Sequence, residues 1–249
     1  MKRIILALLL TACGDKSDDT GDGSTDGGAG DGGSGDGGAG DGGADGGSGD
    51  GGGGGGGDCS NVFPVDQTGA SWRYIYTGPT TGSWTQVAVG METYKGAEAW
   101  RIDGTGNIEG TGYTQSWTMA TWYSCGSEGV KILGSEMTYE GTSGSSGYSG
   151  WTTTSYTTPP LVSPKNLAEG DSWTASYEGS TTSSAGGETP FSYSQTSTVT
   201  GTDSVTVEAG SFDTLVVQYS GSGAAYEQHL AVGVGAVIGD GFELASFTP

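Results

Sequence analysis

Few residues of this sequence could act in catalysis, and they are not arranged in a known catalytic pattern. His229 is the only histidine among the 249 residues, and it stands between Gln228 and Leu230 in an expected strand. A serine hydrolase needs a nucleophile paired with a base, and the sequence contains no Gly-x-Ser-x-Gly segment. Two carboxylates could serve a glycosidase, but the 18 acidic residues of 59–249 form no motif. We therefore predict a protein that is not an enzyme and needs no cofactor.

The amino terminus has the pattern of a cleaved export signal. Met1-Lys2-Arg3 is basic, and the apolar run 4–10 is much shorter than the roughly 20 residues of a membrane-spanning helix. Leu10-Thr11-Ala12-Cys13 follows and resembles the lipobox of bacterial lipoproteins. The resemblance implies cleavage before Cys13, so residues 1–12 are the predicted signal peptide. It also implies a diacylglycerol on the Cys13 sulfur and a further acyl chain, such as palmitate, on the new amine.

Acylation of Cys13 predicts a permanent membrane anchor. One acyl chain binds a bilayer only marginally, at about 0.8 kcal/mol per buried CH₂, whereas two or three chains anchor stably. In bacterial lipoproteins an Asp directly after the lipidated cysteine often disfavours transfer to the outer membrane. Here Gly14 follows, and Asp15 comes one residue later. The resemblance therefore favours the outer over the inner membrane, with either a periplasmic or a surface-exposed position.

Residues 13–58 are predicted to be the lipidated cysteine and a disordered linker. Residues 14–58 contain 24 Gly and 11 Asp, so they bury too little apolar surface to offset the entropy of ordering. A calcium-binding β-roll also mixes Gly and Asp, but each of its turns needs an apolar residue that this segment lacks. A flexible chain of this length reaches about 35–40 Å. The linker is thus expected to hold the rest of the chain away from the membrane.

Cys59 and Cys125 remain once Cys13 is lipidated. Because the cell envelope is oxidising, we predict a disulfide between them, with two unpaired thiols as the alternative. Closing a loop of this length would stabilise the fold by roughly 4 kcal/mol. Two cysteines and one histidine cannot complete a four-ligand zinc site, so no metal is predicted.

Net charge limits the partners of the chain. Residues 59–249 carry 18 acidic and five basic side chains, within a total net charge of −21. Nucleic acid is excluded as a partner because nothing there could neutralise its phosphates. Solubility at the cell surface accounts for the acidity, with divalent-cation binding as the alternative. The predicted partners are the lipid bilayer, through Cys13, and a polysaccharide or an envelope protein.

Residues 59–249 are predicted to be all-β. Every Trp, Tyr and Phe lies in this part of the chain, and side chains alternate around Trp72, Val205 and Leu215. A period of two is typical of half-buried antiparallel strands, and Gly-rich breaks such as 141–150 indicate turns. The expected architecture is an antiparallel meander, a half-barrel or a sandwich built from two similar halves.

Three sequence echoes indicate an internal duplication. The first pairs Val62-Phe-Pro64 and Gly69-Ala-Ser71-Trp72 with Val162-Ser-Pro164 and Gly170-Asp-Ser172-Trp173. The others pair Gly90-Met-Glu92 with Gly201-Thr-Asp203, and Gly129-Val-Lys-Ile132 with Gly235-Ala-Val-Ile238. Pro159-Pro160 would interrupt a strand ladder. The halves are therefore expected to be 59–158 and 159–249, with Trp72 and Trp173 as equivalent core residues.

Three motifs are similar to those of a widespread group of uncharacterised envelope lipoproteins. They are the opening Pro64-x(4)-Gly69-x-Ser-Trp-x-Tyr74, Gly210-Ser-Phe212-Asp-Thr-Leu215 and Gly233-Val-Gly235-x-Val237. The resemblance covers about 62–247 and implies an antiparallel β meander or half-barrel with no established activity. The sequence departs from the group at Ala231-Val232, where aromatic or Lys residues are common.

The aromatic side chains provide a binding hypothesis. Trp84, Trp117, Trp122 and Trp151 lie in Thr/Ser-rich strands and are candidates to stack on sugar rings, with a structural role in the core as the alternative. The predicted function is a non-catalytic binding or structural lipoprotein anchored in the cell envelope. A carbohydrate-binding surface module is the first alternative. A lipid- or amphiphile-binding half-barrel, by analogy of fold alone, is the second.

Overall fold

The computed structural model describes residues 59–221 and 225–249. The predicted signal peptide, Cys13 and the Gly/Asp linker lie outside the described residues. The described chain forms thirteen strands: β1 (Ser71–Tyr76), β2 (Thr81–Tyr94), β3 (Ala97–Gly110), β4 (Tyr113–Gly126), β5 (Gly129–Ser143), β6 (Ser146–Thr158), β7 (Leu161–Pro164), β8 (Ser172–Ser183), β9 (Glu188–Val207), β10 (Gly210–Gly221), β11 (Tyr226–Ala231), β12 (Gly235–Gly239) and β13 (Phe242–Thr248). No helix within these residues is long and apolar enough to cross a membrane.

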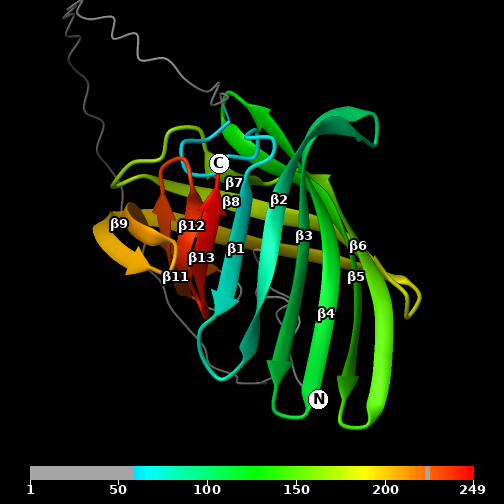
Figure 1. The fold of residues 1–249 in the computed structure, drawn as a ribbon. Helices are drawn as coiled ribbons and strands as arrows, with labels where there is room; N and C mark the ends of the chain where they lie inside the picture. Colours follow the sequence, from blue (N-terminus) through cyan, green and yellow to red (C-terminus); the bar gives the residue numbers. More distant parts are fainter. Residues whose placement is uncertain (1–58, 222–224) are drawn as a thin grey trace, which may run out of the picture. The chain divides into compact units, whose positions relative to one another are not determined.

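The strands form one antiparallel sheet that closes on itself. β1 to β6 make one meander and β8 to β13 another, and the two meet where β1 pairs with β13 and β6 pairs with β8. Within the described residues this ring holds twelve strands, and the short β7 lies outside it, paired with β5. Figure 1 shows β1 to β4 side by side in the near wall, with β8 and β9 crossing behind them.

Closure corrects part of the expected architecture. The all-β antiparallel prediction is confirmed, but the half-barrel and the sandwich were wrong, because the two meanders join into a closed barrel. An open sheet would leave unpaired backbone groups along its two edge strands, and closure removes those edges. The predicted boundary at Pro159-Pro160 falls between the end of β6 at Thr158 and the start of β7 at Leu161. Both meanders belong to one compact unit.

Alternation along each strand separates a packed interior from a polar outer side. In β4, Trp117 and Met119 are buried, whereas Ser116 and Thr118 are exposed. Buried rings from β1, β2 and β13 meet inside the barrel: Tyr74 stacks on Trp84 at 4.8 Å, and Trp84 meets Phe242 edge-on at 5.2 Å. In β3, a Cβ atom at Gly106 would collide with the rings or stems of Trp84 and Trp117. Glycine in this strand therefore makes room for large aromatic neighbours.

The two meanders begin with the same backbone arrangement. Gly69 and Gly170 precede β1 and β8 with φ of 93° and 88°. The Gly69 N–H donates to the Ala88 carbonyl at 2.8 Å, and the Gly170 N–H donates to the Val199 carbonyl at 3.0 Å. Just beyond these acceptors each ladder skips one residue, Val89 in β2 and Thr200 in β9. The echoed pairs Gly69/Gly170 and Gly90/Gly201 thus occupy matching positions.

The segments that precede the two meanders each pack on the other half. Pro164 of β7 pairs with Gly129 at the start of β5. In the same way, Val62, which precedes β1, lies against Gly235 at the start of β12: a Cβ atom built on Gly235 would be 3.6 Å from the Val62 carbonyl oxygen. The Gly233 N–H also donates to the Asn61 carbonyl at 2.7 Å. Each half therefore needs the other to complete its packing.

Cys59 and Cys125 form a disulfide, with their Cα atoms 4.9 Å apart. The predicted pairing is confirmed. Cys125 lies near the end of β4, so the bond joins the segment before β1 to the barrel wall. Cys59 packs in a buried cluster with Val65, Tyr123 and Val130.

Intact-mass analysis should show this bond directly. We expect alkylation under denaturing conditions to modify Cys59 and Cys125 only after reduction, because both sulfurs are in the bond. The double variant Cys59→Ser/Cys125→Ser, which should gain no reducible label, is the control. Two thiols that alkylate without reductant would contradict the disulfide.

Candidate functional site

The four tryptophans predicted to stack on sugar rings lie in different environments. Trp84, Trp117 and Trp122 are buried, with exposed fractions of 4%, 8% and 6%, whereas Trp151 is 42% exposed. Trp84 and Trp117 belong to the interior cluster. Trp122 stacks on Tyr94 at 4.3 Å, and its indole N–H donates to Glu92. Of these four, Trp151 alone presents its ring to a surface ligand.

Trp151 is held in a fixed place on β6. Its backbone N–H donates to the Ser184 hydroxyl at 3.2 Å, and its carbonyl accepts from the Ser184 N–H at 3.0 Å. Across the sheet it pairs with Thr138 of β5. Because side chains on one face recur every second residue, Trp151 and Ser149 point to the same side of β6.

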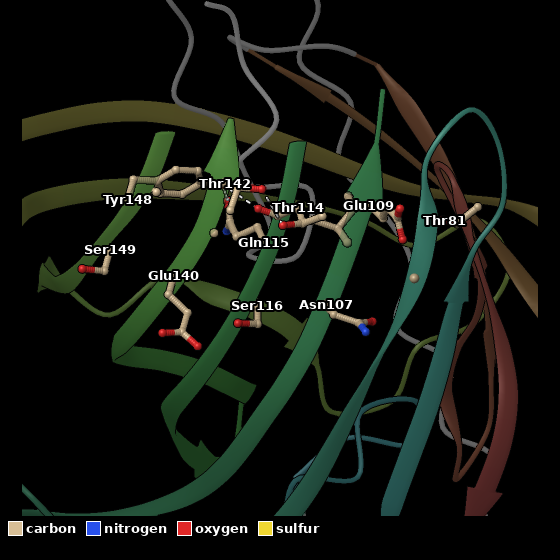
Figure 2. A pocket seen from close by; sticks show the side chains of 14 residues that line it. Thr81, Asn107, Glu109, Thr114, Gln115, Ser116, Glu140, Thr142, Tyr148 and Ser149 are labelled. Carbon is tan, nitrogen blue, oxygen red and sulfur yellow. Dashed lines mark hydrogen bonds between the residues drawn. The ribbon is translucent and has the colours of Figure 1, made fainter. Parts of the chain in front are cut away.

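A groove of about 770 Å³ lies at the end of β2 to β6. It is lined by Thr81, Gly82, Asn107, Ile108, Glu109, Thr114, Gln115, Ser116, Glu140, Gly141, Thr142, Gly147, Tyr148 and Ser149. Asn107, Ser116, Glu140 and Ser149 are exposed and come from four neighbouring strands. Figure 2 shows these four side chains on one side of the ribbon. The groove therefore offers a ligand hydroxyl, carboxamide and carboxylate groups.

Hydrogen bonds fix several of these groove residues. The Thr114 and Thr142 hydroxyls lie 2.9 Å apart, and the Asn107 Oδ1 accepts from the Ser83 N–H at 3.0 Å. The Tyr148 hydroxyl lies 3.1 Å from Gln115 Oε1, so this ring reaches from β6 to β4. A Cβ atom at Gly141 would collide with the Tyr148 ring. The groove wall is thus held in shape before any ligand arrives.

The groove carries negative charge. Glu109 and Glu140 are its ionisable carboxylates, and no Lys or Arg is among the described residues that line it. Repulsion between like charges disfavours an anionic ligand here. No group of three or more His, Cys, Asp and Glu in the described residues could hold a metal ion.

No family model, curated protein or solved structure matches this chain. The resemblance to envelope lipoproteins therefore remains a prediction. Two of its motifs lie at turns. Gly210 begins β10 with a φ of 132°. Gly233 lies between β11 and β12 with a φ of 72°, and Gly235 begins β12 with a φ of 100°. Left-handed φ values favour glycine, so these motifs have a structural cause and identify no ligand.

His229 lies in a second polar cluster, on β11. Its Nδ1 is 3.2 Å from the Thr214 hydroxyl, and its Nε2 is 3.5 Å from Glu227 Oε1. A hydroxyl that contacts an imidazole, which in turn contacts a carboxylate, is the arrangement used in nucleophilic catalysis. Here, however, Thr214 is only 3% exposed, and its hydroxyl donates to the Asp203 carbonyl at 2.9 Å. The Thr214 oxygen therefore accepts from His229 and cannot be reached by a substrate, so the cluster is structural.

Sequence reasoning missed the residues that line the groove, and the predicted Trp151 is not one of them. Asn107, Ser116, Glu140 and Ser149 are far apart in sequence, and only the strand register brings them together. The one available signal is the alternation of small polar residues with Gln115, Trp117 and Met119. It predicts an outward polar face, but it does not show which strands are neighbours.

Proposed function

We propose that this chain is an acyl-anchored lipoprotein of the bacterial cell envelope that displays a non-catalytic β-barrel as a binding module. The observation that carries the anchor is Cys13 in a lipobox-like setting, after a short apolar run and before a long Gly/Asp segment. The disulfide supports export, because such bonds persist in oxidising compartments. The outer membrane is the proposed location, since Gly14 rather than Asp follows Cys13.

The barrel suits a binding role better than a catalytic one. Its one hydroxyl–imidazole–carboxylate cluster is closed to substrates by the burial of Thr214. Its outer side is polar: the Thr118 and Thr138 hydroxyls lie 2.7 Å apart, and those of Thr174 and Thr196 lie 2.9 Å apart. The groove on that side presents polar groups, and the exposed Trp151 lies two residues from the lining residue Ser149 on β6. Polar groups beside an aromatic ring are found in ligand sites.

The outer groove is favoured over the interior as the ligand site. An amphiphile carrier needs an apolar cavity, but the interior rings of Tyr74, Trp84 and Phe242 pack on one another. Among the two kinds of ligand considered, carbohydrate and amphiphile, a carbohydrate is therefore favoured. The amphiphile-binding description has less support, because these packed rings occupy the interior where an amphiphile would bind.

We also infer that the barrel arose by duplication of a six-stranded unit. Gly69 and Gly170 occupy matching turns, and the ladder irregularities after Ala88 and Val199 match as well. The third echo, at Gly129 and Gly235, marks the starts of β5 and β12, each the fifth strand of its meander.

The anchor is tested by the substitution Cys13→Ser. We expect the wild-type chain to sediment with membranes and to partition into detergent, because two or three acyl chains hold it there. The variant should lose this partitioning. It should be found either as an uncleaved chain that keeps its signal peptide or as a soluble chain that is free of membranes. The double variant Cys59→Ser/Cys125→Ser, which alters the other cysteines, should still partition into detergent. A processed Cys13→Ser chain that remains fully in the detergent phase would overturn the anchor.

A further inference from the structure

The outer side of β2 to β6 presents two regular rows of side chains. In the first row the strand register aligns Ser83, Asn107, Ser116, Glu140 and Ser149. In the second it aligns Thr85, Thr105, Thr118, Thr138 and Trp151. Neighbouring strands lie about 4.8 Å apart, and two residues along a strand span about 7 Å. The exposed Trp151 ring therefore stands within one row of Glu140 and Ser149, which line the groove.

We infer that this groove, together with Trp151, binds a neutral carbohydrate chain. The inference rests on the proposed binding role of the barrel and names the ligand class of that site. The C–H face of a pyranose ring packs on an indole face, and Trp151 offers such a face at 42% exposure. The hydroxyls of the same sugar both donate and accept hydrogen bonds. Asn107, Ser116, Glu140 and Ser149 supply matching partners in one row.

Other ligand classes fit this surface less well. Glu109 and Glu140 repel acidic glycans and nucleic acid. A peptide that adds as a strand needs an unpaired sheet edge, whereas β3, β4 and β5 are paired on both sides at Asn107, Ser116 and Glu140. A peptide held by apolar side chains needs apolar pockets, but the four exposed residues of the groove row are polar.

Rigidity strengthens the case for the groove. Ser184 holds the Trp151 backbone on both its N–H and its carbonyl side. Tyr148 braces β6 against β4 from the opposite face, and the Thr118 and Thr138 hydroxyls join β4 to β5 at 2.7 Å. A site that is already ordered loses little side-chain entropy when a ligand binds.

Calorimetric titration of the full chain in detergent tests the inference. The probes are two neutral hexasaccharides, cellohexaose and N-acetyl-chitohexaose, and polygalacturonate serves as the anionic comparison. We expect the wild-type chain to bind at least one hexasaccharide and not to bind polygalacturonate. Trp151→Ala should weaken hexasaccharide binding about tenfold or more, since a few aromatic contacts often carry most of the binding energy. Glu140→Gln should weaken it as well, because a charged acceptor makes stronger hydrogen bonds than a neutral one.

Matched controls separate the groove from general effects. Met91→Ala also removes an exposed apolar side chain, and Glu178→Gln removes an exposed carboxylate from β8. Both should bind as the wild type does. The inference is overturned if neither hexasaccharide binds at millimolar concentration, or if the groove variants bind no more weakly than the controls. Because the Cys13→Ser test reads membrane partitioning alone, failure here leaves the anchor proposal standing.

Discussion

Raising the pH above 10 should unfold this barrel in one cooperative transition near pH 11. Five tyrosines carry the effect: Tyr74, Tyr123, Tyr156, Tyr177 and Tyr219. Burial is the main cause that raises the pKa of each hydroxyl far above its ordinary value of 10.0. Tyr76 adds to them, because burial raises its pKa to about 12. In the folded barrel these groups therefore stay protonated in moderately alkaline solution.

The direction of the pH effect follows from where the protons bind. Below pH 10 these tyrosines are protonated in both the folded and the unfolded state, so they do not lower the free energy of unfolding there. Above pH 10 only the unfolded chain releases the protons, and stability falls until the pH passes the raised pKa values of the fold. At pH 11 each buried tyrosine costs about 1.4 kcal/mol, or roughly 7 kcal/mol for five. That loss rivals the whole stability of a typical domain, about 5–15 kcal/mol.

Two spectra recorded in one titration check this expectation. Part of the phenolate absorbance near 295 nm should appear only together with the loss of the far-ultraviolet circular dichroism of the sheet, because the buried hydroxyls ionise only on unfolding. Tyr177→Phe removes one ionisable group and keeps the ring that stacks on Tyr193, so it should move the midpoint to higher pH. If all twelve tyrosines ionise near pH 10 while the sheet signal stays intact, the buried arrangement is wrong.

The sequence predicted local features of this fold well. Alternation around Trp72 and Leu215 indicates strands, and the two cysteines left for pairing indicate the disulfide, because each signal depends on neighbouring residues or on a count. Barrel closure depends on β1 meeting β13 and β6 meeting β8, which no local pattern specifies. For the same reason, composition alone did not separate the exposed Trp151 from Trp84, Trp117 and Trp122. All four lie among Thr and Ser, and what distinguishes them is the side of the sheet that each ring faces and whether other residues cover that side.

Trp122 illustrates this limit most clearly. Trp122 and Tyr123 are adjacent in β4, whose pairing with β3 is regular at this point, so the two rings point to opposite sides of the sheet. Both are nevertheless buried, in different clusters. Alternation alone would predict that one of them is in solvent. On the side that Trp122 faces, Tyr94 stacks on its ring and Glu92 accepts from its indole N–H, and these contacts cover it.

Trp72→Ala should be the most damaging single substitution of the repeat positions. Trp72 is 4% exposed and stacks on Phe247 of β13 at 5.8 Å. Its Nε1 donates to the Val234 carbonyl at 2.5 Å, which connects β1 to the turn before β12. Loss of a buried aromatic ring costs about 3–5 kcal/mol, and the abandoned carbonyl adds about 1 kcal/mol. The variant should therefore lose most of the stability of the barrel.

Urea unfolding of the full chain, followed by circular dichroism, measures this loss. Trp173 starts β8 as Trp72 starts β1, but it is only half-buried, so Trp173→Ala should cost less than Trp72→Ala. Trp151→Ala removes an exposed ring of the same type and should change the free energy of unfolding by no more than about 0.5 kcal/mol. A graded loss, largest for Trp72 and smallest for Trp151, is expected because the cost follows the apolar contact that each ring makes. Equal losses for all three would contradict this prediction. They would mean that the contacts of Trp72 with Phe247 and Val234 do not hold β1 against β13 and the turn before β12.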